Sequence, residues 1–260
     1  MPKSINVYAL PVLLPEVADC ADRIAVVIDV LRATTSMIYG LHHGVREVIP
    51  VLDIETAIKL RRSFPDGSTF LGGERQGKRI EGFDLGNSPN EFQSENVKGK
   101  RIIVTTTNGT VAINAARKYP HLFLAGFVNA GTVVDRLSSF DNIDIICSGS
   151  DGQYTEEDLL LAGLLVERLC RRSMENLSPP HFSLPSLNVQ AVTARENWTQ
   201  CFPRENPSAD DLCTQLKKTR GAKVMLALGI DAEILVASQL DSLDTVPRFD
   251  DNRIIIEPVA

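Results

Sequence analysis

Polar side chains able to bind a metal ion or an anion follow five short apolar segments of the chain. These segments have the length and composition of buried strands. The polar residues after them are, in order, Asp29 and Arg32, Glu74 and Arg75, residues 105–108, Asn129, and residues 148–151. Ligands of open parallel sheets bind at the carboxyl ends of strands, so we expect one edge of the sheet to gather these residues and residues 151–158. Each junction taken singly also fits a helix cap or a turn, but the five together favour a site.

The residue types at this edge suit phosphoryl transfer better than acyl or hydride transfer. Carboxylate oxygens are ligands of Mg²⁺, which is usually held by one or two carboxylates together with substrate phosphate. Residues 108–110 are placed to open a helix, whose first backbone amides bind phosphate oxygens. Arg32 and Arg75 are suited to clamping anionic oxygens. Metal, helix N-terminus and anion clamp together predict a Mg²⁺-dependent phosphatase.

Several common catalytic motifs are absent from the sequence. It contains no G-x-x-x-x-G-K-[ST] phosphate loop, no G-x-G-x-x-G after a strand and no G-x-S-x-G elbow. Cys147 follows a strand, but Gln153 stands where thiol phosphatases resemble one another in having arginine. We therefore interpret Cys147 as a buried strand residue. The four histidines show no metal-binding spacing.

The elements that must position these residues alternate between apolar strands and helices. We expect strands at residues 24–30, 45–51, 68–71, 101–105, 121–125, 143–147 and 253–257, and helices at residues 53–63, 108–118, 155–172, 209–228 and 231–240. This alternation is typical of a layered α/β/α fold with a largely parallel or mixed sheet. We predict one domain over residues 1–260, with two α/β lobes as the alternative. The Pro-, Ser- and Asn-rich residues 173–208 are predicted to form an irregular excursion.

Composition and charge exclude several classes of protein. A net charge of −6 over 260 residues argues against a nucleic-acid partner, yet allows an anionic substrate held by local cations. The five cysteines are odd in number and include no CxxC pair, which predicts reduced thiols and a cytoplasmic protein rather than disulfides or structural zinc. No segment approaches the ~20 apolar residues of a membrane span, so no membrane partner is expected. The sequence does not decide the oligomeric state, and a homodimer is one of the possibilities.

Four motifs, in order along the chain, resemble those of one family. They are IDVLRATT at 28–35, LGGER at 71–75, GFDLGNSP at 82–89 and TTNGT at 106–110. Together they are similar to the 2-phosphosulfolactate phosphatase family, over about residues 24–247 but not over 173–208. The resemblance implies a family-specific α/β fold and a Mg²⁺-dependent acid phosphatase. It also implies hydrolysis of (R)-2-phospho-3-sulfolactate to 3-sulfolactate and phosphate, a step toward coenzyme M.

Three groups of candidate site residues follow from the strand ends and the resemblance. The candidate metal ligands are Asp29, Glu74, Asp84, Glu157 and Asp158. The candidate catalytic residues are Asp29, Arg32, Glu74 and Asn108. The candidate substrate-binding residues are Arg75, Arg79, Asn87, Ser88, Thr106, Thr107, Gly109, Thr110 and Asn129. Mg²⁺ is the predicted cofactor, and a small phosphorylated anion is the predicted substrate.

Alternatives stay open for mechanism and for function. Asp29 is either a metal ligand with water as the attacking group, which we favour, or a covalent nucleophile as in phosphatases with a D-x-D-x-[TV] motif. Leu31 stands at the second Asp position of that motif. Arg75 either binds a remote anion of the substrate or pairs with Glu74 or another acid. A non-catalytic sensor of phosphorylated metabolites and a Mg²⁺-dependent lyase or isomerase are rival functions, and release of inorganic phosphate separates the phosphatase from both.

Overall fold

The computed structural model describes residues 1–16, 20–175, 184–204 and 206–256. Its strands are β1 (Ser4–Tyr8), β2 (Ile24–Ile28), β3 (Glu47–Pro50), β4 (Thr69–Arg75), β5 (Lys78–Arg79), β6 (Arg101–Thr105), β7 (His121–Ala125), β8 (Asn142–Cys147), β9 (Ser186–Leu187), β10 (Pro247–Asp250) and β11 (Arg253–Ile256). Its α-helices are α1 (Ala33–His42), α2 (Ile54–Arg61), α3 (Pro89–Phe92), α4 (Gly109–Ala116), α5 (Ala130–Leu137), α6 (Glu156–Glu175), α7 (Val189–Cys201), α8 (Ala209–Leu216), α9 (Arg220–Ala227) and α10 (Ala232–Ala237).

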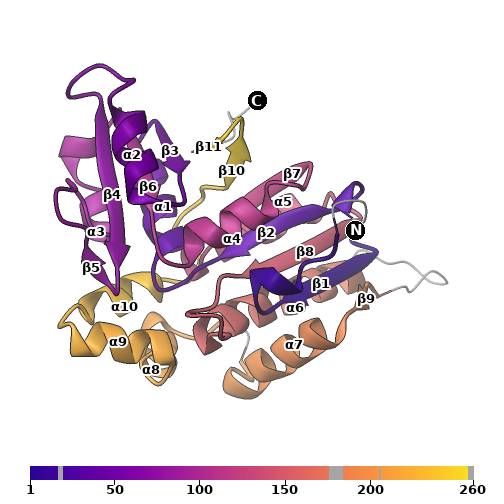
Figure 1. The fold of residues 1–260 in the computed structure, drawn as a ribbon. Coiled ribbons are helices and arrows are strands. Elements are labelled where there is room, and N and C mark those ends of the chain that lie inside the picture. The colour runs from indigo at the N-terminus through magenta and orange to yellow at the C-terminus, as the bar shows by residue number, and fades with distance from the viewer. Residues whose placement is uncertain (17–19, 176–183, 205, 257–260) are drawn as a thin grey trace.

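The strands of the described residues form one mixed sheet, in the order β5-β4-β6-β3-β11-β10-β7-β2-β8-β1-β9 (Figure 1). Strands β4, β6 and β3 run parallel in one half, and β7, β2, β8 and β1 run parallel in the other. The antiparallel β10–β11 hairpin joins the halves, because β10 pairs with β7 and β11 pairs with β3. The predicted α/β class with a mixed sheet is confirmed.

Strand β2 shows why helices cover both faces of the sheet. All five of its residues are buried. Val26 and Ile28 belong to the apolar cluster that includes α5 and α6, whereas Ala25 and Val27 belong to the cluster that includes α1 and α4. Successive side chains of a strand point to opposite faces, so a continuous apolar run suits a strand between two helical layers. No helix in the described part of the chain is both long and apolar enough to cross a bilayer.

Part of the segment predicted to be an irregular excursion is a packed helix. Ala191, Ala194 and Trp198 of α7 recur at helical spacing and are buried. A Cβ added to Gly163 of α6 would lie 2.1 Å from the carbonyl oxygen of Ala194, so α6 and α7 pack closely. Strand β9 also pairs with β1. The prediction is therefore wrong for residues 186–201, because one apolar stripe outweighs a polar composition; residues 176–183 lie outside the described residues.

Candidate functional site

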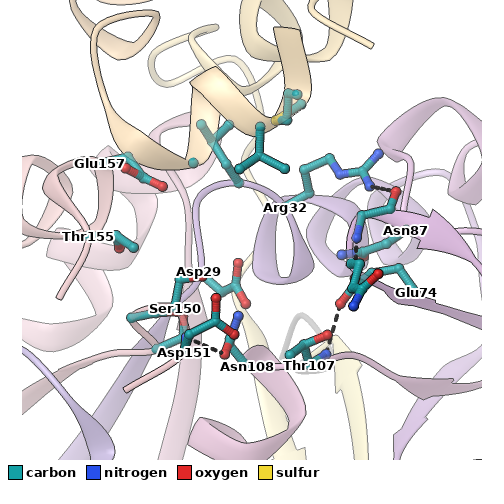
Figure 2. Close-up of a pocket in the computed structure, with 18 of the residues that line it drawn as sticks. Asp29, Arg32, Glu74, Asn87, Thr107, Asn108, Ser150, Asp151, Thr155 and Glu157 are labelled. Carbon is teal, nitrogen blue, oxygen red and sulfur yellow. Dashed lines mark hydrogen bonds between the residues drawn. The ribbon is translucent and has the colours of Figure 1, made fainter. Parts of the chain in front are cut away.

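A cavity of about 520 Å³ lies beyond the carboxyl ends of β4 and β6 from one half of the sheet and of β2 and β8 from the other. Figure 2 shows Asp29, Asn108 and Asp151 grouped together, with Thr107 next to Asn108 and hydrogen-bonded to Glu74. The structure thus brings together many of the residues expected from the strand ends. The predicted site residues that line the cavity are Asp29, Arg32, Glu74, Arg75, Asn87, Thr107, Asn108, Glu157 and Asp158.

The remaining predicted site residues do not line this cavity. They are Arg79, Asp84, Ser88, Thr106, Gly109, Thr110 and Asn129. Asp84 Oδ2 accepts hydrogen bonds from Arg61 Nη1 and from the Leu71 amide, each at 2.8 Å. The Asn129 side chain accepts from the Gly126 amide at 2.9 Å and donates to the Thr245 carbonyl oxygen at 2.8 Å. Both side chains are thus bound to other parts of the protein, and Asp84 does not join the other predicted metal ligands.

Asp29 follows β2 and lies against the first residue of α4. Its Oδ1 accepts a hydrogen bond from the Ala33 amide at 3.1 Å, which fixes the carboxylate at the start of α1. A Cβ added to Gly109 would lie 2.6 Å from Asp29 Oδ2 and 2.5 Å from the Ala33 Cβ. Only glycine lets the α4 N-terminus come this close to the carboxylate. Gly109 therefore shapes the site although it does not line the cavity.

The turn that opens α4 is held by its own threonines. The Thr110 amide donates to Thr106 Oγ1 at 3.1 Å, and Thr110 Oγ1 donates to the Thr106 carbonyl oxygen at 2.9 Å. The Thr107 amide donates to Glu74 Oε1 at 2.8 Å. Among the described residues, no atom accepts a hydrogen bond from the amides of Asn108 and Gly109. These two amides are left to bind an anion at the helix N-terminus.

Glu74 and Arg32 connect three segments around the cavity. Glu74 Oε2 accepts from the Gly77 amide at 2.8 Å, so its carboxylate joins the β4–β5 turn to the loop after β6. Arg32 Nη2 donates to the Gly77 carbonyl oxygen at 3.0 Å. Arg32 Nη1 donates to Glu233 Oε2 of α10 at 2.7 Å, in an ion pair buried on both sides. Glu233 therefore balances the charge of Arg32.

Arg75 lines the same cavity but is bound differently. Its guanidinium donates to the carbonyl oxygen of Glu74 at 2.7 Å and to Thr105 Oγ1 at 3.0 Å. It forms no ion pair with any residue that the structure describes. The pairing of Arg75 with an acid, one of the two alternatives from the sequence, is not found there. The charge of Arg75 acts without an ion pair on the exposed Asp53, whose pKa it helps to lower after the hydrogen bonds from Thr56.

Asp158 and Glu157, in the first turn of α6, bring two more buried carboxylates to the cavity. Asp158 Oδ1 accepts from the Val30 amide at 2.9 Å, and its Oδ2 accepts from Ser148 Oγ at 3.1 Å. Glu157 Oε2 is buried without a hydrogen-bond partner among the described residues. Asp158 therefore holds the loops after β2 and β8 in place, and Glu157 keeps an oxygen free.

Crowding of buried carboxylates gives the cavity its electrostatic character. Burial, reinforced by the charges of Asp158, Glu74 and Glu157, raises the pKa of Asp29 to about 8. Burial and the charge of Asp158 raise the pKa of Glu157 to about 7. Burial also raises the pKa of Asp158. Each shift shows that ionisation is opposed where no cation compensates it, so a bound cation would be stabilised here.

The donor set fits Mg²⁺ in its chemistry. The described residues contain no group of three or more His, Cys, Asp or Glu side chains spaced to hold a metal ion. Mg²⁺ does not require one, because it retains water ligands and is completed by substrate phosphate. Glu74 and Asp158 use both carboxylate oxygens to accept hydrogen bonds, whereas Asp29 and Glu157 each keep one oxygen with no donor among the described residues. Asp29 and Glu157 are therefore the two of these four carboxylates with an oxygen that no described donor occupies.

Comparison with known proteins identifies the family. A family model described as 2-phosphosulpholactate phosphatase matches residues 8–252. The chain belongs to this family. A relative from Caldicellulosiruptor saccharolyticus, named probable 2-phosphosulfolactate phosphatase, is 43% identical over 244 residues, which cover 92% of this chain and 93% of the relative. Relatives with the same name from Caldanaerobacter subterraneus subsp. tengcongensis and Thermotoga petrophila are 43% and 35% identical, over 89% and 87% of this chain and 89% of each relative. The resemblance inferred from the four motifs is confirmed.

One wall of the cavity in this member of the 2-phosphosulfolactate phosphatase family was not predicted from the sequence. Helix α9 contributes Gly221, Val224 and Met225, and Leu228 and Ile230 follow it. The spacing 221, 224, 225 and 228 is that of one helical face, and this pattern is visible in the sequence. Such a stripe normally indicates core packing, so only the structure shows that it also borders a cavity.

Proposed function

We propose that this chain is a Mg²⁺-dependent phosphoric monoester hydrolase for a phosphorylated 2-hydroxy acid. The observation that carries the proposal is that the buried Asp29 carboxylate, which lines the cavity, lies against the start of α4, where the amides of Asn108 and Gly109 have no acceptor among the described residues. Family membership supports the reaction class, and the names of the relatives make (R)-2-phospho-3-sulfolactate the first substrate to test.

Each part of the cavity has a task in this proposal. The amides of Asn108 and Gly109 bind phosphoryl oxygens, where the dipole of α4 favours negative charge. Arg75 binds the carboxylate of the substrate, because its guanidinium is the cavity-lining cation with no ion pair among the described residues. Mg²⁺, held by Asp29 and Glu157, would supply positive charge beside the phosphoryl group. Glu74 and Arg32 hold the surrounding loops.

The proposed reaction transfers the phosphoryl group to water. The water oxygen forms a bond to phosphorus, the bond between phosphorus and the C2 oxygen breaks, and a proton from water goes to the departing alkoxide. The products are the free hydroxy acid and inorganic phosphate. We favour water over Asp29 as the nucleophile because Leu31 replaces the second aspartate of the D-x-D-x-[TV] motif and lies in the cavity wall.

Phosphate release from (R)-2-phospho-3-sulfolactate in the presence of Mg²⁺ tests the proposal. We expect stoichiometric release of phosphate and 3-sulfolactate, loss of activity in excess chelator, and recovery when Mg²⁺ is returned. Substrate-induced thermal stabilisation without phosphate release would instead favour a sensor. Conversion of the substrate into a product that retains its phosphate would favour a lyase or an isomerase.

A further inference from the structure

Glu233, in the first turn of α10, is buried and contacts the cavity only through Arg32. Its Oε2 accepts a hydrogen bond from Arg32 Nη1 at 2.7 Å, in the ion pair buried on both sides. A buried guanidinium needs a counter-charge, and its planar fork is oriented when two acceptors bind it. The second acceptor is the carbonyl oxygen of Gly77, 3.0 Å from Arg32 Nη2. Glu233 and Gly77 together thus fix the direction of Arg32.

The contact with Gly77 continues through Glu74 to the turn that opens α4. The Gly77 amide donates to Glu74 Oε2 at 2.8 Å, and Glu74 Oε1 accepts from the Thr107 amide at 2.8 Å (Figure 2). Thr107 directly precedes Asn108 and Gly109, whose amides bind phosphoryl oxygens in the proposed function. A series of four hydrogen bonds therefore runs from the α10 carboxylate to this turn.

The β4–β5 turn in the middle of this series is held tightly. Gly77 is bound through both its carbonyl oxygen and its amide, which belong to neighbouring planar peptide units. Gln76 and Gly77 both have positive φ, 54° and 77°, as a tight two-residue turn requires. A Cβ added to Gly77 would lie 2.6 Å from Leu228 Cδ1, so the turn also packs against the residue that follows α9. A change in the direction of Arg32 is therefore transmitted to Glu74.

We propose that Glu233 is a positioning residue of the active site. Its carboxylate orients Arg32, and the hydrogen bonds that follow hold the turn that opens α4 in the geometry that binds phosphoryl oxygens. Without this charge the guanidinium is buried without a counter-charge and must find another acceptor, which releases the β4–β5 turn. The inference rests on the proposed phosphatase function and adds to it a residue outside the cavity lining on which phosphate affinity depends.

The affinity for inorganic phosphate in the presence of Mg²⁺ tests the proposal without turnover. Glu233→Gln keeps the shape of the side chain and removes its charge. We expect its Kd for phosphate, measured by calorimetry, to rise ~2- to 30-fold, the range for substitutions along a coupled network. Glu233→Asp keeps the charge with a shorter reach and should recover part of the affinity. In the ligand-free protein, amides of residues 105–110 should exchange hydrogen faster in Glu233→Gln than in wild type.

Glu167→Gln is the matched control. Glu167 is also a buried glutamate, 7% exposed against 8% for Glu233, and it accepts hydrogen bonds from Arg171 and from Arg195 between α6 and α7. It lies outside the cavity lining. Glu167→Gln should therefore lose stability as Glu233→Gln does, but its phosphate Kd and the exchange of residues 105–110 should match those of wild type.

The outcomes separate this role from the phosphatase function. A native phosphate Kd in folded Glu233→Gln, or an equal rise in Glu167→Gln, would overturn the positioning role and leave the phosphatase function intact. If Glu233→Gln does not fold, Glu233→Asp provides the test: a smaller rise in Kd is expected, and a native Kd would overturn the proposal. A wild-type protein that neither binds phosphate nor releases it from (R)-2-phospho-3-sulfolactate would refute the phosphatase function and, with it, this inference.

Discussion

At the scale of single residues, the Asp29 carboxylate has one oxygen fixed by the Ala33 amide and the other beside α4. Asp29→Asn keeps the shape and the acceptor for Ala33 but removes the charge. We expect turnover to fall at least ~10²-fold, as when one electrostatic group is removed from an active site. Thermal stability should not fall, because no described cation pairs with this carboxylate. Phosphate release and a thermal melt measure the two effects.

Asp84→Asn is the matched control, since Asp84 also lies in a family motif but outside the cavity lining. The Asp84 carboxylate accepts hydrogen bonds from Arg61 and from the Leu71 amide. The variant should therefore lose stability and keep most of its turnover. Near-native turnover in folded Asp29→Asn would remove Asp29 from the mechanism. A loss of turnover in Asp84→Asn but not in Asp29→Asn would show that the metal is not held by Asp29.

The guanidinium of Arg75, which forms no ion pair among the described residues, gives a second prediction at this scale. Arg75→Ala should lower kcat/KM for phosphorylated hydroxy acids by ~10- to 150-fold, since a charge-assisted hydrogen bond contributes roughly 1.5–3 kcal/mol. A simple phosphate monoester without a second anion, such as phenyl phosphate, should be hydrolysed almost as before. Kinetics on both substrates separate the roles. An equal loss of kcat/KM on both substrates would mean that Arg75 acts at the phosphoryl group or in the scaffold. Unchanged kcat/KM on both substrates would exclude Arg75 from substrate binding.

The residues that the sequence predicted well are those whose position depends on local structure. A polar residue that closely follows a buried strand is carried to the sheet edge by that strand, as Asp29 is one residue after β2 and Asn108 is three residues after β6. The sequence does not show which residue will be the hydrogen-bond or ion-pair partner of each polar group. Arg32 meets Glu233 across 201 positions of the chain, and Asp84 meets Arg61 across 23. Such pairings depend on tertiary packing. The sequence alone therefore does not show that Arg32 forms an ion pair and that Arg75 does not.

At the scale of elements, the contact between α4 and the loop after β2 requires glycine at position 109. Gly109→Ala would insert a Cβ 2.5 Å from the Ala33 Cβ, so one of the two segments must move. We expect a loss of about 1–3 kcal/mol in unfolding free energy, typical of overpacking, together with a large loss of turnover. Urea denaturation and phosphate release test this.

A second substitution distinguishes packing from chemistry at this contact. Ala33→Gly in the Gly109→Ala background removes the clash between the two Cβ atoms and should recover part of the stability. It should not recover turnover, because the new Cβ would still lie 2.6 Å from Asp29 Oδ2. A Gly109→Ala enzyme with native stability and native turnover would show that α4 does not need this close approach.

Strands were predicted correctly where the sequence contains an uninterrupted run of apolar residues. The strands β2, β6, β7 and β8 were expected within two residues of their observed bounds. The helix expected at residues 209–228 is instead two helices, because Thr219 caps α9 by accepting a hydrogen bond from the Ala222 amide. Strands β1 and β10 were not expected. Both are short and only alternately buried or partly exposed, so their apolar signal is weak.

At the scale of the whole molecule, the C-terminal β10–β11 hairpin lies between strands formed much earlier in the chain. Periodicity predicts that a segment is a strand but not which strand will be its neighbour, so this order was beyond sequence reasoning. Glu47 of β3 strengthens the joint. Its Oε1 accepts from Arg101 Nε of β6 at 2.5 Å, and its Oε2 accepts from Arg253 Nη1 of β11 at 3.1 Å. One buried carboxylate thus connects three adjacent strands.

This joint predicts a component of acid denaturation that is separate from the active site. Burial alone would raise the pKa of Glu47, but hydrogen bonds from Arg46, Arg253 and Arg101 outweigh it and hold the pKa below its ordinary value of 4.5. The unfolded chain therefore binds the proton more readily, so the stabilisation by Glu47 is complete above about pH 4.5 and is lost as the pH falls through the folded-state pKa. Glu47→Gln should lower the unfolding free energy at neutral pH by about 3 kcal/mol, as expected when one partner of a buried ion pair is removed. In urea titrations the gap between wild type and variant should narrow as the pH falls below about 4.5; a gap independent of pH would mean that Glu47 acts through packing and not through its charge.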